Sequence, residues 1–129
     1  MKIKYSGIAE VLAALREGKP VIISDAEDRE NEGDAIIAAQ FATPEWVAWM
    51  VRYTSGYLCA PMSEERANQL ELPLMWLNSE DPHQTAYTVS VDAANRKSTG
   101  ISAAERANTA NVLSTPPSKP SSLLRPGPV

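Results

Sequence analysis

The spacing of apolar residues predicts one helix and two strands in the N-terminal part of the chain. A helix over residues 8–16 is indicated by apolar residues at i, i+3, i+4 and i+7, namely Ile8, Val11, Leu12 and Leu15. Gly18 is placed to end it, because glycine readily takes the left-handed backbone that follows a helix. The apolar runs at residues 21–23 and 35–39 predict two buried strands, with a strongly acidic segment between them.

Three further helices are predicted, each from the polar residue that would cap its first turn. Thr43, followed by proline, starts a helix that ends near residue 53. Ser63 starts a brief helix that runs to about residue 70. Ser102, with Glu105 three positions later, forms a capping box for a final helix that ends near residue 113.

Two more strands complete the expected fold, at residues 57–60 and, from its alternating polarity, at residues 87–92. Because strands and helices interleave, we expect a single α/β domain of the α+β layered type, with helices packed on a mixed sheet. We expect this domain to span residues 1–113. Residues 114–129 are rich in proline and serine and should bury little, so we expect an extended or disordered tail.

Composition excludes several classes of function. A chain of 129 residues is one domain's worth. Its net charge of −4 argues against a nucleic-acid binder, which would show a basic patch. No stretch approaches the roughly 18 apolar residues of a membrane span, and the N-terminus lacks the pattern of a signal peptide. Cys59 is the only cysteine, so no intrachain disulfide can form. We expect a soluble, cytoplasmic protein.

The acidic segment is the main candidate for chemistry. Six carboxylates lie between positions 25 and 34, opposed only by Arg29. One interpretation is a solvated loop between two strands, in which Asn31 and Gly33 make the turn. The other is a site for a hard divalent cation, because Mg²⁺ takes one or two protein carboxylates together with substrate oxygens. The remaining carboxylates could then transfer protons. Spacing alone does not separate these two interpretations.

The order Asp-Arg-Glu-Asn-Glu-Gly-Asp at residues 28–34 resembles the signature of the 3,4-dihydroxy-2-butanone 4-phosphate synthase family of riboflavin biosynthesis. Further segments resemble this family at the right separations. They are FATPE at 41–45, SGYLCAP at 55–61, TAYTVSVD at 85–92 and STGISAAER at 98–106. The resemblance covers roughly residues 5 to 110 in register.

The resemblance implies a lyase that converts D-ribulose 5-phosphate to formate and L-3,4-dihydroxy-2-butanone 4-phosphate. It implies a homodimer with an α/β fold that uses Mg²⁺ or Mn²⁺ and places its site near the dimer interface. The reaction passes through an enediolate, so it needs a metal to stabilise that charge and several groups that transfer protons. Its substrate is a small sugar phosphate.

Site residues are also implied by the resemblance, position by position. Glu30 matches the metal-binding glutamate, which also binds substrate. Arg29 and Asp34 match residues that contact the sugar phosphate, and Glu32, Asp34 and Cys59 match the catalytic group. Thr99 matches a threonine that lines the substrate site. Two of these matches have ordinary structural alternatives: Cys59 as a small buried core residue and Thr99 as part of the turn before the last helix.

The chain departs from the family at its C-terminal end. Family members continue through an Arg-Pro-Gly-His-Val segment and a Gly-His-Thr-Glu segment that carries the second metal ligand. Here residues 125–129 read Arg-Pro-Gly-Pro-Val, and the second segment is absent. We therefore expect this chain to lack the C-terminal third of the family fold, which should expose apolar surface. The alternative to an enzyme is a catalytically degenerate member that acts as a binding or regulatory partner, pairing with a fuller-length homologue.

Overall fold

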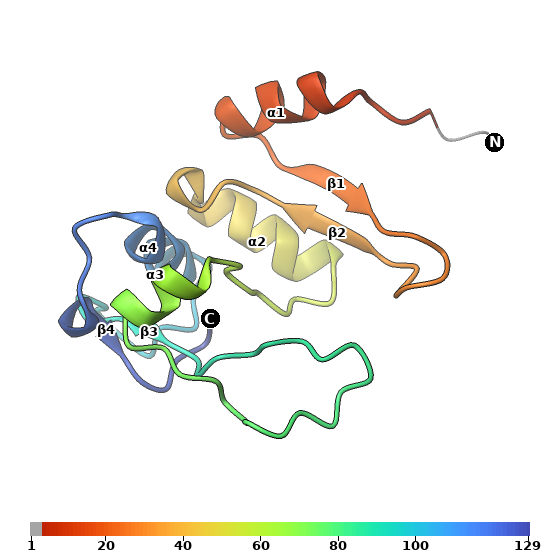
Figure 1. Ribbon diagram of the computed structural model, residues 1–129. Helices are drawn as coiled ribbons and strands as arrows, with labels where there is room; N and C mark the ends of the chain where they lie inside the picture. The colour runs from red at the N-terminus through yellow and green to blue at the C-terminus, as the bar shows by residue number, and fades with distance from the viewer. Residues whose placement is uncertain (1–3) are drawn as a thin grey trace.

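Helices and short strands alternate along residues 4–129, the part of the chain that the computed structural model describes (Figure 1). In chain order the elements are α1 Ile8–Arg16, β1 Val21–Ser24, β2 Gly33–Ile36, the 3₁₀ turn η1 Ala39–Phe41, α2 Pro44–Tyr53, α3 Glu64–Gln69, β3 Asp92–Ala93, α4 Ala103–Ser114, the 3₁₀ turn η2 Pro120–Ser122 and β4 Leu123–Leu124. The helices form close to their predicted positions. Within residues 4–129, none of them is both long and apolar enough to span a membrane.

The predicted α+β fold is confirmed, and its strands pair as two separate antiparallel ladders in place of one mixed sheet. β1 pairs with β2, and β3 pairs with β4. The strand expected at 57–60 is absent, and the strand expected at 87–92 is reduced to one bridge between Leu74 and Thr88 and the start of β3. Both segments have strand-like sequences. A strand also needs a neighbouring strand to bond with, and the described chain supplies little for these two.

Neither face of the β1–β2 hairpin is fully covered by other parts of the described chain. Its register places Val21 opposite Ile36 and Ile23 opposite Asp34. We expected its apolar runs to be buried, and this is wrong: Ile22 is 64% exposed and Ile23 is 42% exposed. A continuous β-branched run is typical of a strand buried on both faces, yet here neither face is fully covered.

Helix α4 packs against α2 beside the hairpin. Ala42, Val47 and Ala107 form a buried cluster between them. The side-chain amide of Asn111 donates to the carbonyls of Ala39 (2.8 Å) and Ala42 (3.1 Å), so it fixes η1 to the side of α4. These contacts hold the segment that follows β2 against the helical layer.

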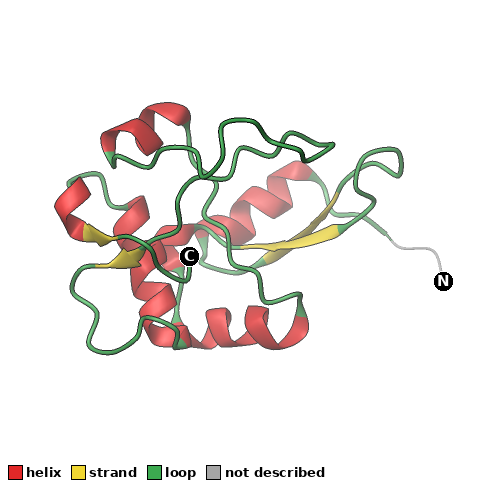
Figure 2. Cartoon of the chain, turned by 90° about the horizontal axis from the view of Figure 1, so that it is seen from below, coloured by secondary structure: helices red, strands yellow, loops and turns green. Residues whose placement is uncertain are grey.

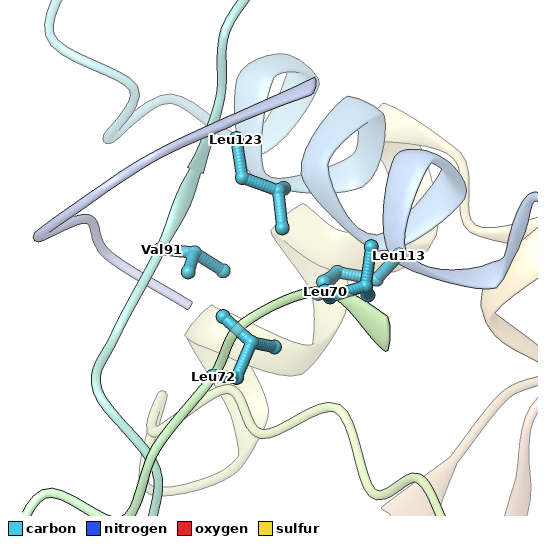
Figure 3. Close-up of a cluster of buried hydrophobic side chains, with 5 residues drawn as sticks. All are labelled: Leu70, Leu72, Val91, Leu113 and Leu123. Carbon is cyan, nitrogen blue, oxygen red and sulfur yellow. The ribbon is translucent and has the colours of Figure 1, made fainter. Parts of the chain in front are cut away.

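A second apolar cluster lies on the other side of α4, where segments distant in sequence meet (Figure 3). Its buried members are Leu70, Leu72, Val91, Leu113 and Leu123. The expectation that residues 114–129 bury little is therefore wrong. Leu123 is only 4% exposed, and Val129 packs on the cluster while bonding with the backbone of Val91 in both directions, at 2.8 and 3.2 Å.

Two arginines hold the C-terminal segment in place. Arg66 of α3 donates to the carbonyls of Leu113 (3.1 Å) and Thr115 (2.7 Å). These bonds hold the C-terminal end of α4 against α3. Arg125 donates to the carbonyls of Leu70 and, at 3.3 Å, Glu71. Carbonyls at the C-terminal ends of α3 and α4, which lack partners within their own helices, are thus satisfied by long cationic side chains.

Replacing Leu123 tests whether the tail belongs to the core. We expect Leu123→Ala to lower the free energy of unfolding by about 2–5 kcal/mol, because it leaves a cavity in a packed cluster. Leu124→Ala is the matched control, since the neighbouring side chain is 40% exposed and should cost much less. Urea denaturation of the two variants measures the difference. Equal, small losses would contradict the packed position of Leu123.

Candidate functional site

Asp25 organises the acidic loop between β1 and β2. Its carboxylate oxygens accept the backbone amides of Glu30 (3.0 Å) and Glu32 (2.9 Å), and its own amide donates to the Glu32 carbonyl (3.2 Å). These bonds, led by that from Glu32 and assisted by Arg29, lower the pKa of Asp25. Asn31 takes a positive φ of 53°, which lets the chain turn back into β2. These hydrogen bonds give the loop a defined path.

Arg29 neutralises two of the loop's acids. Its Nε lies 2.8 Å from Asp25, while Nη1 and Nη2 donate to the two carboxylate oxygens of Glu30 at 2.9 and 3.1 Å. All three guanidinium nitrogens thus have a carboxylate partner. Glu32 and Asp34 are exposed on the β2 side of the loop, where a substrate could reach their carboxylates.

Cys59 lies near Asp34 of this loop. It is exposed at the surface, which argues against the buried-core alternative. Partial burial and the nearby charge of Asp34 raise the pKa of the Cys59 thiol. The thiol is therefore protonated at neutral pH, and it stands close enough to Asp34 for their charges to interact.

Two tyrosines that the sequence analysis did not identify stand at the same place. The rings of Tyr57 and Tyr87 meet edge to face with centroids 6.0 Å apart. Burial, followed by the negative charges of Cys59, Tyr57, Asp81 and Glu30, raises the pKa of Tyr87. Tyr87 therefore lies near Cys59 and Glu30. It takes one of the apolar positions in a run of alternating polarity, so its sequence gave no sign that it belongs to a site.

Asp81 shapes the loop that leads to Tyr87. Its carboxylate accepts the amides of Thr85 (2.8 Å) and His83 (3.2 Å), and the bond from Thr85 is the main cause that lowers the pKa of Asp81. Asp81 therefore does for residues 81–85 what Asp25 does for residues 25–32. In each loop, an aspartate near the start of the turn accepts two backbone amides from residues that follow it in the chain. Aspartate at the start of a turn is the sequence signal that could have indicated both loops.

Thr99 does not join this group. It lines a separate pocket of about 290 Å³ with Asp92, Arg96, Ile101 and Gly127. Asp92 of β3 lines this pocket, and Figures 1 and 2 both show β3 at the opposite end of the molecule from the β1–β2 hairpin. The predicted site residues therefore fall into two places: Arg29, Glu30, Glu32, Asp34 and Cys59 in one, and Thr99 in the other.

The acidic loop fits a metal ion of limited protein coordination. Among residues 4–129, no three or more His, Cys, Asp or Glu side chains converge as a ready metal cage. Glu30 offers hard oxygen donors, but both oxygens are engaged by Arg29. This donor set suits Mg²⁺, which keeps several waters and takes few protein carboxylates along with substrate oxygens.

The environment of Cys59 gives a direct test of this geometry. Because the thiolate is the reacting form, we expect slow alkylation of wild-type Cys59 at pH 7.5. Asp34→Asn removes one of the two causes of the raised pKa and should speed alkylation, while Asp28→Asn at the loop tip should not. The rate of iodoacetamide labelling against pH reports this cleanly, since Cys59 is the only cysteine. If Asp34→Asn leaves the dependence of the labelling rate on pH unchanged, the charge of Asp34 does not act on Cys59.

The chain is similar to proteins of one known family over most of its length. The family model described as 3,4-dihydroxy-2-butanone 4-phosphate synthase matches residues 9–129. The enzyme of that name from Candida albicans is 53% identical over 123 residues, which are 95% of this chain and 60% of the relative. The riboflavin biosynthesis protein RibBA of Salinispora arenicola is 51% identical over 95% of this chain and 29% of its own length.

A solved structure shares the fold as well as the sequence. A crystal structure of 3,4-dihydroxy-2-butanone 4-phosphate synthase in complex with two magnesium ions superposes with a TM-score of 0.95 at 46% identity. The match covers 97% of this chain and 58% of that one. The chain thus spans about 60% or less of the length of these relatives. The family model, the identities and the superposition agree, and the chain belongs to the 3,4-dihydroxy-2-butanone 4-phosphate synthase family.

Proposed function

We propose that this chain carries out the lyase reaction of its family, in which ribulose 5-phosphate yields formate and 3,4-dihydroxy-2-butanone 4-phosphate. The observation that carries the proposal is the loop organised by Asp25. It presents Glu32 and Asp34 to solvent beside Cys59 while Arg29 occupies Glu30. The reaction needs groups that remove and return protons next to a carbonyl, and this loop supplies them on a short, ordered segment.

The hydrogen-bond and ion-pair partners of each residue indicate its role in the reaction. Glu32 and Asp34 are the carboxylates free to accept protons, and the protonated Cys59 is placed to donate one. Arg29 supplies positive charge for the phosphate or for substrate oxygens when it exchanges one carboxylate partner. Magnesium, which a solved relative holds as two ions, would be held by Glu30 in place of Arg29 and would supply charge that stabilises negative oxygen on the substrate.

A formate assay tests the proposal. We expect purified protein with ribulose 5-phosphate and Mg²⁺ to release formate, and chelation to stop the release. Glu32→Gln should lower kcat at least about 100-fold, the usual share of a general acid or base. Glu27→Gln, in the same loop but among neither the Asp25 nor the Arg29 bonds, is the matched control. A folded wild-type protein that makes no formate would instead favour the degenerate member that acts as a binding partner.

We also propose that a second polypeptide completes the site. The separation of Thr99 from the acidic loop supports this, because within one copy the two lie at different places (Figure 1). The exposed hairpin supports it too, since an isolated strand pair is only marginally stable in water. A homodimer supplies Thr99 of one copy to the loop of the other. Pairing with a fuller-length homologue would also cover the hairpin. We place this assembly in the cytoplasm, in keeping with a single free thiol.

Mixing two inactive variants distinguishes a shared site from a site within one copy. Glu32→Gln damages only the acidic loop, and Thr99→Ala damages only the other pocket. If sites are shared between copies, the mixed dimer contains one intact site, so activity should return on mixing. Dimer formation itself is measured by analytical ultracentrifugation. Dimers that stay inactive after mixing and exchange would show that both residues act within the same copy.

A further inference from the structure

Glu105 reaches further than a helix cap requires. Its amide donates to Ser102 Oγ at 3.2 Å, which is the first half of a capping box. In the usual second half, the glutamate accepts the amide of the N-cap residue, as Glu10 of α1 accepts the Gly7 amide at 3.2 Å. The Glu105 carboxylate is instead bonded to the preceding loop. It accepts the amides of Lys97 (3.0 Å), Ser98 (2.7 Å) and Gly100 (2.9 Å) and the Ser98 hydroxyl (2.8 Å).

The same loop is held from a second side by Asp92 of β3. Asp92 is 1% exposed, bonds to Thr109 of α4 at 3.1 Å, and pairs with Arg96 at 3.2 Å. Gly100 passes so close to it, at a φ of 80°, that a Cβ there would overlap the Asp92 carboxylate. The loop therefore has little freedom at either end. Its path is set by two carboxylates, one buried and one half-buried.

Thr99 lies in the chain between Ser98 and Gly100, two of the three residues whose amides Glu105 accepts. It is exposed and lines the 290 Å³ pocket with Asp92 and Arg96. Since Ser98 and Gly100 are both fixed, the direction of the intervening residue is fixed with them. An ionised carboxylate suits this task because it only accepts hydrogen bonds, and every group converging on it is a donor. The bonds, led by that from the Ser98 side chain, also lower the pKa of Glu105 and keep it ionised.

We propose that Glu105 is a positioning residue that fixes the loop at residues 97–100 so that Thr99 meets the sugar phosphate. The inference rests on the proposed function, in which Thr99 binds substrate. Glu105 itself touches no substrate and acts through the loop at residues 97–100. Glutamine at this position keeps the shape but offers one acceptor oxygen, and its amide group would face other N–H donors.

Glu105→Gln, with Glu10→Gln as the matched capping control, tests the proposal. Binding of ribulose 5-phosphate in Mg²⁺ buffer is measured by calorimetry, and protection of loop amides by hydrogen exchange. We expect Glu105→Gln to weaken binding ~10-fold, the effect typical of removing a group that orients a binding residue. The amides of Lys97, Ser98 and Gly100 should exchange faster. Glu10→Gln should change neither quantity.

A double-mutant cycle with Thr99→Ala separates positioning from general stability. If Glu105 acts through Thr99, adding Glu105→Gln to Thr99→Ala should not weaken binding further. Additive losses, or wild-type binding by Glu105→Gln, would overturn the proposal. Should Glu105→Gln fail to fold, Ser98→Ala removes a single bond and should weaken binding less, in the same direction. Ser98→Ala that binds as wild type would equally overturn it.

The wild-type protein separates this failure from that of the proposed function. If it binds ribulose 5-phosphate and releases formate while Glu105→Gln binds equally well, only the role of Glu105 is lost. If the folded wild-type protein binds no ribulose 5-phosphate, the proposed function and the role of Glu105 fall together.

Discussion

Helix α4 is packed on two sides at once, and both apolar clusters depend on it. Ala107 faces α2 on one side, and Leu113 joins the cluster around Leu70 on the other. Thr109 between them is fully buried, where its hydroxyl bonds with Asp92 and with the amide of Ala93. A helix that must fit between two layers needs small residues on most faces, which is why its sequence, AAERANTANVLS, shows no single apolar stripe.

Carboxylates that accept backbone amides organise the loops around both halves of the site. Asp25, Asp81 and Glu105 each take two or more amides from residues nearby in the chain. Such bonds favour the charged form, so each carboxylate stays ionised without a cation. Glu32 and Asp34 are left outside this arrangement. Within the described chain, Glu27 and Asp28 likewise accept no amide, so the hydrogen bonds identify the acid that builds the loop, and the family motif is what distinguishes Glu32 and Asp34 from Glu27.

The β1–β2 hairpin lies exposed to water, although its apolar run is typical of a buried strand. The relatives that the chain matches are longer than it is. Ile22 and Ile23 lose the stabilisation of burial when water covers them, about 25 cal/mol for each Å² of apolar surface. A further chain segment on the hairpin would recover it.

The sequence by itself determined the helices and the acidic loop, because helix caps, helical periodicity and turn residues act between neighbours in the chain. Thr43 and Ser102 cap α2 and α4 as predicted, and Asn31 makes the predicted turn. Family motifs predicted Glu32, Asp34 and Cys59 as site residues, a prediction that needs no knowledge of long-range contacts. Only the tertiary structure decided what depends on partners distant in sequence. Strand pairing around residues 57–60 and 87–92, the burial of Leu123, the tyrosines beside Cys59 and the separation of Thr99 from the loop all require long-range contacts, which no local pattern encodes.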